Sequence, residues 1–238
     1  MKINVIILAG GVGNRMGAPM PKQFLSLNDK PVIVHTILNF QKNDRINDIV
    51  IVCVKDWIPQ MEQIVQEYNL YKVKWVIEGG QTAHDSTRNG VFFFKDKLQN
   101  NDFVVIHDAA RPILPQAAIN EMLDVASEKG NASLVIPCYE TVLFTKDNKS
   151  GDKELDRNSI MRIQTPQAYK YEQILNLYEM AEKDNIHDFV YADIVAVHYG
   201  QPVYFSKGFT NNIKITRKED IPLTKALLNF SEDELFNL

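Results

Sequence analysis

Residues 5–16 have the sequence VIILAGGVGNRM, in which an apolar run from Val5 to Ala9 is followed at once by three glycines within four positions. The apolar run predicts a buried β-strand, and the glycines predict a tight loop whose backbone N–H groups can surround an anion. Arg15 lies in this loop and Lys22 follows shortly after it, so two cations accompany the backbone donors. This combination favours a phosphate-binding loop over a turn that only needs the conformational freedom of glycine.

The loop differs from two common phosphate-binding motifs. It lacks the Gly-Lys-Ser/Thr ending of a P-loop, and its glycines do not have the Gly-x-Gly-x-x-Gly spacing of dinucleotide-binding folds. The next predicted strand, residues 49–54, does not end in the acidic residue that would hold a ribose in such a fold. The loop therefore indicates a phosphate site without identifying the nucleotide.

Short apolar runs alternate with amphipathic segments along most of the chain. Buried strands are predicted at 5–9, 49–54, 73–77, 103–106 and 133–136, and helices at 31–41, 57–68, 85–97, 115–128 and 171–183. Further strands are expected at 203–205 and 213–215, with a last helix from about residue 218. This alternation indicates an α/β fold with a mostly parallel sheet covered on both faces, in which ligands bind beyond the carboxyl ends of the strands.

The alternation stops between about residues 140 and 162. There Val142-Leu143-Phe144 and Leu155 flank a polar turn at 147–152, which predicts an exposed β-hairpin that protrudes from the sheet as an arm. Because an isolated hairpin is only marginally stable, we expect the arm to pack on a second subunit.

Composition limits the possible classes of protein. The chain has 238 residues of which 45% are hydrophobic, enough for one domain with a full core, and its net charge of -4 argues against binding to nucleic acid. Cys53 and Cys138 lie in apolar runs without metal-ligand spacing, as expected for buried thiols in a reducing compartment. The apolar run near the N-terminus is too short for a signal peptide or a membrane span, so we expect a cytoplasmic protein with no membrane or nucleic-acid partner.

Polar residues follow other predicted strands at the same edge of the sheet. Asp108 and Arg111 lie in the sequence HDAARP after the strand at 103–106, where they could position a cation and a phosphate or merely pair with each other. Lys214 alternates with two isoleucines in NIKIT and therefore points away from the face that they bury, toward either a ligand or solvent. Residues 79–86, GGQTAHDS, could contact a base or form a simple strand–helix turn with Asp85 or Ser86 as N-cap.

Five segments together resemble one family, the cytidylyltransferases that act on 2-C-methyl-erythritol 4-phosphate or on ribitol 5-phosphate. They are LAGGVGNRM at 8–16, PKQF at 21–24, HDAARP at 107–112, QTPQ at 164–167 and NIKIT at 212–216. The resemblance covers nearly the whole chain and implies one nucleotidyltransferase domain over residues 1–238. Its implied fold is a three-layer, Rossmann-like, mostly parallel sheet of the nucleotide-diphospho-sugar transferase type, with a β-arm at about 140–162 used for dimerisation.

The resemblance also implies roles for individual residues. CTP would be bound by the glycine loop and by the start of a helix, through Ala9, Gly10, Gly11, Val12, Gly13, Asn14, Arg15, Lys22, Gly80 and Ser86. The polyol phosphate would contact Asp108, Ala109, Arg111, Thr165 and Lys214, together with Thr141 and Arg157 from the arm of the neighbouring subunit in a homodimer. Arg15, Lys22, Asp108 and Lys214 would be catalytic, with a Mg²⁺ cofactor bound at Asp108.

The sequence departs from the family pattern at two places. Ala83 and His84 stand where members commonly carry Arg followed by Gln or Asn, and Ala192 replaces the Thr of a Thr-Asp pair near the polyol. The missing Thr favours D-ribitol 5-phosphate or a similar sugar-alcohol phosphate as the acceptor, with CDP-polyol and pyrophosphate as products. The alternatives are the methylerythritol enzyme of isoprenoid synthesis, a sugar-phosphate nucleotidyltransferase that uses UTP, GTP or ATP, and a non-catalytic dimeric sensor of CTP.

Overall fold

A seven-stranded sheet forms the centre of the computed structural model, with the strand order β11-β7-β10-β6-β1-β4-β5. The structure describes residues 1–11 and 20–236. The strands of the sheet are β1 (Ile3–Ala9), β4 (Ile49–Cys53), β5 (Val73–Glu78), β6 (Phe103–Asp108), β7 (Asn131–Pro137), β10 (Met161–Lys170) and β11 (Phe205–Lys207). Neighbouring strands are parallel except that β10 runs antiparallel to both β6 and β7, which confirms the predicted mostly parallel α/β sheet.

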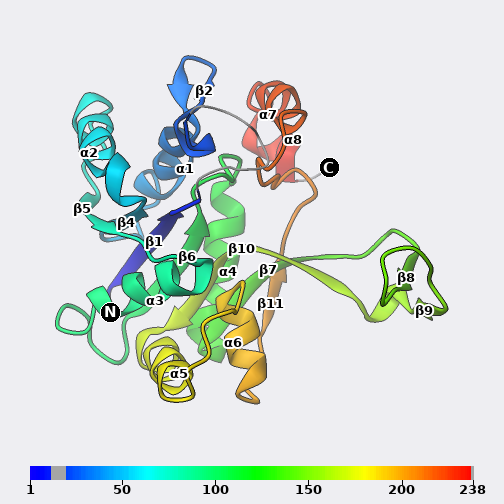
Figure 1. Cartoon of the computed structure of the whole chain (residues 1–238). Helices are drawn as coiled ribbons and strands as arrows, with labels where there is room; N and C mark the ends of the chain where they lie inside the picture. Colours follow the sequence, from blue (N-terminus) through cyan, green and yellow to red (C-terminus); the bar gives the residue numbers. More distant parts are fainter. Residues whose placement is uncertain (12–19, 237–238) are drawn as a thin grey trace.

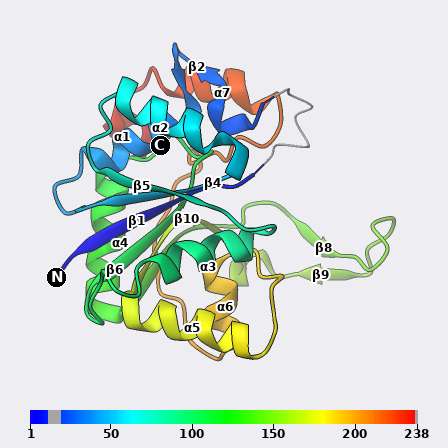
Figure 2. The same cartoon turned by 60° about the vertical axis from the view of Figure 1, so that its left-hand side comes forward.

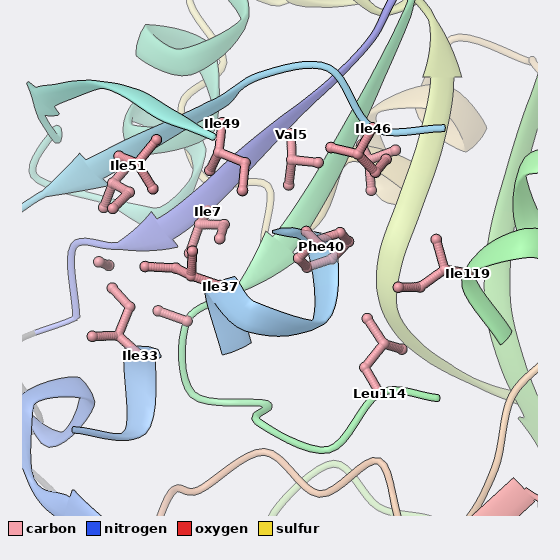
Figure 3. Close-up of a cluster of buried hydrophobic side chains, with 14 of the residues drawn as sticks. Val5, Ile7, Ile33, Ile37, Phe40, Ile46, Ile49, Ile51, Leu114 and Ile119 are labelled. Atoms are coloured by element: carbon pink, nitrogen blue, oxygen red, sulfur yellow. The ribbon is translucent and has the colours of Figure 1, made fainter. Parts of the chain in front are cut away.

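Helices cover both faces of this sheet and make three layers (Figures 1 and 2). The helices are α1 (Val32–Gln41), α2 (Ile58–Glu67), α3 (Ala83–Phe93), α4 (Gln116–Lys129), α5 (Tyr171–Lys183), α6 (Ala192–His198), α7 (Asp220–Leu227) and α8 (Glu232–Phe236). Alternate residues of a strand point to opposite faces, so Val5 and Ile7 of β1 pack with Ile37 of α1 (Figure 3), whereas Ile6 packs with Val91 of α3. Each face of β1 thus belongs to a separate hydrophobic core.

The predicted arm is present and protrudes from the body of the molecule (Figures 1 and 2). It consists of the antiparallel strands β8 (Val142–Phe144) and β9 (Lys153–Leu155), with Val142 paired to Leu155. The side chains of Leu143 and Phe144 are 56% and 43% exposed, so the apolar residues of the arm find little cover within this chain.

One of the two strands predicted near the end of the chain is absent, and the other is shifted along the sequence. Residues 213–215 form no strand, because this segment packs on the loop after β6, where the N–H of Ile215 donates to the carbonyl of Ala110 at 2.9 Å. Residues 203–205 were expected to be a strand, but the strand found there is β11, which begins at Phe205. The long strand β10 was not predicted, because Pro166 lies at its centre and proline is rare in the interior of a sheet.

Candidate active site

A cavity of about 320 Å³ lies beyond the carboxyl ends of β1 and β6. Its walls come from segments far apart in the sequence: Leu8, Gly10, Gly11, Lys22, Gln23, Gly80, Gln81, Thr82, Ala83, Ser86, Asp108, Ala109, Ala110, Val190, Tyr191 and Lys214. Parallel strands bring their carboxyl ends to one edge of the sheet, which is where ligands of open α/β sheets bind. The cavity is therefore in the place that the sequence analysis predicted.

Asp108, the last residue of β6, is the electrostatic centre of the site. Its Oδ1 atom is 2.9 Å from Nζ of Lys214, and its Oδ2 atom accepts a hydrogen bond from Nε of Arg111 at 3.0 Å. Burial alone would raise the pKa of the Asp108 carboxyl, but the charges of Lys214 and Arg111 outweigh burial and hold this pKa well below its usual range. In return, the carboxylate outweighs the effect of burial on Lys214 and raises the pKa of the ammonium group, so Lys214 stays charged.

The loop after Asp108 is fixed by buried hydrogen bonds. Burial lowers the pKa of His107 to about 4, so the imidazole is neutral, and its Nε2–H donates to the carbonyl of Arg111 at 3.1 Å. The hydroxyl of Thr36 in α1 donates to the carbonyl of Ala109 at 2.8 Å, and Nδ2 of Asn39 donates to the carbonyl of Pro112 at 2.8 Å. The loop thus has a preformed shape before any ligand arrives.

The QTPQ and NIKIT segments interlock beside Asp108. The buried amide of Asn212 donates to the carbonyl of Thr165 at 2.8 Å, and Nη1 of Arg111 donates to the carbonyl of Asn212 at 2.7 Å. The hydroxyl of Thr165 accepts from the N–H of Asp108 at 3.2 Å. These contacts hold the irregular segment that carries Lys214 against the end of β6, which explains how a lysine outside the sheet reaches the site.

The opposite wall of the cavity is formed by the glycines before α3. Thr82 is the N-cap of this helix and forms a capping box with Asp85, so the expectation that Asp85 or Ser86 caps the helix was wrong. Ser86 instead faces the cavity, and its Oγ accepts from the N–H of Gly80 at 3.1 Å. A Cβ on Gly10 would lie 2.9 Å from this Oγ, so a larger residue there would displace the Ser86 hydroxyl from its present position.

Lys22 enters the cavity from a short 3-10 helix, Lys22–Phe24, that follows the glycine loop. The buried side chain of Gln23 donates to the carbonyl of Ala9 at 2.7 Å and so fastens this helix to the end of β1. The side chains that follow Gln23 are apolar and pack inward, with the ring of Phe24 stacked on Trp57 at 4.8 Å between centroids. Lys22 is thereby placed on the same cavity as Lys214.

A second cavity of about 310 Å³ lies on the other side of Lys214. Its walls are Arg111, Ile136, Arg162, Ile163, Gln164, Thr210, Asn212, Ile213 and Lys214. Lys214 therefore borders both cavities, and its Nζ also lies 5.4 Å from the ring centroid of Tyr191. Tyr191 and Arg162 were missed by the sequence analysis, because neither residue belongs to a recognisable motif. The departure from the family pattern at Ala192 was a signal for its neighbour Tyr191.

The predicted site residues fall into four groups. Gly10, Gly11, Lys22, Gly80, Ser86, Asp108, Ala109 and Lys214 all line the first cavity. Ala9, Arg111 and Thr165 do not line it but hold residues that do, and Arg111 also borders the second cavity. Thr141 and Arg157 lie on the arm, are exposed and border neither cavity. Val12, Gly13, Asn14 and Arg15 lie outside the described residues.

Two adjoining cavities share Lys214 at the edge of the sheet, where glycines follow β1, and this arrangement is the one expected of a nucleotidyltransferase. The model of the family of 2-C-methyl-D-erythritol 4-phosphate cytidylyltransferase (IspD) matches residues 3–230. The chain belongs to this family and is a cytidylyltransferase.

Relatives and solved structures agree with this assignment. The chain is 39% identical to the ribitol-5-phosphate cytidylyltransferase of Lacticaseibacillus paracasei, over 97% of the chain and 99% of that protein. It is 36% identical to the 2-C-methyl-D-erythritol 4-phosphate cytidylyltransferase of Clostridium novyi, over 94% and 95% of the two chains. The crystal structure of 2-C-methyl-D-erythritol 4-phosphate cytidylyltransferase from Francisella tularensis superposes with a TM-score of 0.81 at 25% identity, covering 95% of this chain and 99% of that one.

Proposed function

We propose that this cytidylyltransferase transfers CMP from CTP to D-ribitol 5-phosphate and releases pyrophosphate. The observation that carries the proposal is the position of Lys214 between the two cavities. The cavity that the glycines border suits the nucleotide, and the one that Arg111 and Arg162 border suits the phosphate of the acceptor. Ribitol is favoured over methylerythritol because the relative with 39% identity carries the ribitol name, whereas the methylerythritol relatives from Clostridium novyi and Clostridioides difficile are each 36% identical.

The proposed reaction needs no general base in the protein. An oxygen of the ribitol phosphate, already ionised at neutral pH, attacks the α-phosphorus of CTP, and the bond from that phosphorus to the bridging oxygen of the β-phosphate breaks. Pyrophosphate leaves with the electron pair of the broken bond. Lys22, Lys214 and, from the glycine loop, Arg15 offset the negative charge that develops, by positioning and electrostatics.

In this scheme Asp108 acts through Lys214 and Arg111. The carboxylate keeps Lys214 charged and fixes its Nζ on one side while Tyr191 lies on another. A preorganised cation stabilises the transition state without the reorganisation that a mobile side chain would need.

Mg²⁺ at Asp108 does not fit the contacts of this residue. Mg²⁺ is usually held by one or two carboxylates together with substrate phosphates. Asp108 is the only carboxylate that borders the nucleotide cavity among the described residues, and both its oxygens already face cations. We propose instead that Mg²⁺ enters as part of the substrate, as the MgCTP complex. Calorimetry should then detect Mg²⁺ binding with CTP present and none without it.

The proposal includes a homodimer formed through the arm. Leu143, Phe144 and the neighbouring Tyr139 are exposed by 56%, 43% and 67%, and a two-stranded hairpin is marginal alone. Thr141 and Arg157 lie on this arm and border neither cavity of their own chain, so the proposal places them at the acceptor of the partner subunit. Sedimentation should show a dimer that weakens when Leu143 and Phe144 are replaced by serine.

A reducing, cytoplasmic location is also part of the proposal, because Cys53 and Cys138 are both free and buried. No helix within the described ranges has the length and apolar character needed to cross a membrane.

The experiment that tests the function is pyrophosphate release against a panel of substrates. CTP is compared with UTP, GTP and ATP, and ribitol 5-phosphate with methylerythritol 4-phosphate, glycerol phosphates and other alditol phosphates. The proposal requires the highest kcat/KM for CTP with ribitol 5-phosphate. A preference for methylerythritol 4-phosphate would assign the chain to isoprenoid synthesis, and CTP binding without release for any acceptor would support a sensor.

A further inference from the structure

A cluster of three metal-ligating side chains lies beside the nucleotide cavity, outside the catalytic residues. His84 is in the first turn of α3, Glu182 is in the last turn of α5, and His187 is in the loop before α6. Their ligand atoms all lie within 4.8 Å of one another. Two helices and a loop thus bring two imidazoles and one carboxylate to a single point.

The two ring nitrogens of His84 have no hydrogen-bond partner among the described residues. Its side chain is buried, with 1% of the residue exposed, and neither Nδ1 nor Nε2 has a hydrogen-bond partner. Burial lowers the pKa of His84, so the imidazole is neutral and carries one bare ring nitrogen. The ring packs between Tyr178 and Phe189, with centroids 5.0 and 5.6 Å away, and these contacts restrict its orientation. A buried imidazole usually has a hydrogen-bond partner, so an oriented, neutral imidazole without one is a good candidate for a metal ligand.

His187 presents a second bare nitrogen to the same point. Its Nε2 atom is 3.2 Å from Oδ1 of Asn185, which only accepts hydrogen bonds, so Nε2 is the donor in this contact. Nδ1 is buried without a hydrogen-bond partner, and it faces two carboxylate oxygens, Oε1 of Glu182 at 3.4 Å and Oδ1 of Asp85 at 3.8 Å. A dication placed among these atoms would interact favourably with the ring nitrogen and with the carboxylate oxygens. A hydrogen bond from the far nitrogen to an amide oxygen is also the usual support of a metal-ligating histidine.

The carboxylate of Glu182 has one oxygen that remains available to a metal ion. Nη1 of Arg88 pairs with Oε1 of Glu182 and lies 3.4 Å from Oδ1 of Asp85. Oε2 of Glu182 makes no hydrogen bond or ion pair with another described residue. The cluster therefore combines imidazole nitrogens with a carboxylate oxygen, which is the donor set that zinc and its neighbours in the first transition row prefer.

We propose that His84, Glu182 and His187 bind one first-row transition-metal dication of the Zn²⁺ class. The site would tie together two walls of the nucleotide cavity. Thr82, on one wall, already donates to the carbonyl of His187 at 3.3 Å, and Val190 and Tyr191, three and four residues later, form the other wall. A bound metal fixes the chain before α6 to the start of α3 and so orders the cavity from outside the catalytic centre.

The test is metal binding by the tag-free full-length protein after treatment with a chelator. Calorimetry with Zn²⁺ should give one ion per chain, and Co²⁺ should give a visible absorption band that Zn²⁺ displaces. His187→Ala and Glu182→Gln should each weaken binding by at least about tenfold. His198→Gln, which removes an exposed histidine outside the cluster, should leave binding unchanged. His84→Phe retains aromatic packing and should abolish binding even though the metal-free protein stays folded.

Two further measurements separate a metal site from a structural cluster. Zn²⁺ should raise the Tm of the wild type and slow amide exchange over residues 184–191, and it should do neither in His187→Ala. The proposal is overturned if the wild type binds no Zn²⁺, or if it binds Zn²⁺ as tightly as His187→Ala and Glu182→Gln do.

Discussion

Lys214→Met is the substitution that bears most directly on the mechanism. Methionine keeps an unbranched apolar stem of similar length and removes the ammonium group that lies 2.9 Å from Asp108 and borders both cavities. Loss of one preorganised group that stabilises transition-state charge typically lowers kcat by about 10²–10³, equivalent to roughly 3–4 kcal/mol. We expect a decrease of this size in kcat, because the proposed role of Lys214 is confined to the step in which charge moves to pyrophosphate.

The fold should tolerate this substitution. Asp108 would keep Nε of Arg111 at 3.0 Å and the hydroxyl of Thr165 at 3.4 Å, so its buried carboxylate stays paired. The free energy of unfolding should therefore fall by less than the ~3–5 kcal/mol that an uncompensated buried charge costs. A thermal melt of the variant separates a catalytic effect from unfolding.

The assay is continuous release of pyrophosphate at saturating CTP and acceptor. Lys218→Met is the matched control, because Lys218 is exposed, lies four residues along the chain and borders neither cavity. If a folded Lys214→Met enzyme turned over as fast as Lys218→Met, Lys214 could not stabilise the transition state and the reasoning would be refuted.

Three further predictions concern other parts of the site. Ser86→Ala should raise the KM for CTP by about tenfold with little change in kcat, since it removes roughly one hydrogen bond from the nucleotide wall; an unchanged KM would exclude Ser86 from nucleotide binding. The lowered pKa of Asp108 makes ionised Asp108 stabilising above its unfolded pKa of about 4, and this stability is lost as the pH falls further, so the Tm difference between wild type and Asp108→Asn should shrink from pH 7 to about pH 3. A constant difference would contradict the ion-pair account. A mixture of Arg157→Ala and Lys214→Met subunits should regain activity, because one site of each mixed dimer has both an intact Lys214 and a partner arm with Arg157; no recovery would mean that Arg157 acts within its own chain or not at all.

The elements that the sequence predicted correctly are those with a local signal. The apolar runs that became β1 (Ile3–Ala9) and β6 (Phe103–Asp108) have the length of buried strands. Glycines mark the end of the first run, and a polar motif marks the end of the second. The same signal located the ligand edge of the sheet, because the carboxyl ends of parallel strands meet there.

The features that the sequence could not supply depend on contacts between distant residues. Strand β10 is rich in buried polar side chains, such as Gln167, whose amide donates to the carboxylate of Asp193 at 2.7 Å; neither partner is recognisable from its own neighbours in the chain. Arg111 shows the same limit. Its sequence context is compatible with a phosphate ligand or an ion pair, and the structure has it paired with Asp108 and also at the edge of the second cavity.

Lys214 gives a mixed result. Its alternation with isoleucines predicted the direction of the side chain, but it did so by assuming a strand that is absent. The segment is irregular, and its position comes from the hydrogen bonds of Asn212 and from the backbone of Ile215. These contacts join residues more than 40 positions apart, so a local pattern could not reveal them.

The most direct test of the account follows isotopically labelled oxygen from the acceptor into the products by phosphorus NMR. Ribitol 5-phosphate with labelled non-ester phosphate oxygens is incubated with CTP, Mg²⁺ and the enzyme. The account predicts CDP-ribitol with label in the bridge between its two phosphorus atoms, and pyrophosphate without label. Label in pyrophosphate, or the absence of CDP-ribitol from a reaction that consumes CTP, would contradict transfer of CMP to the acceptor phosphate.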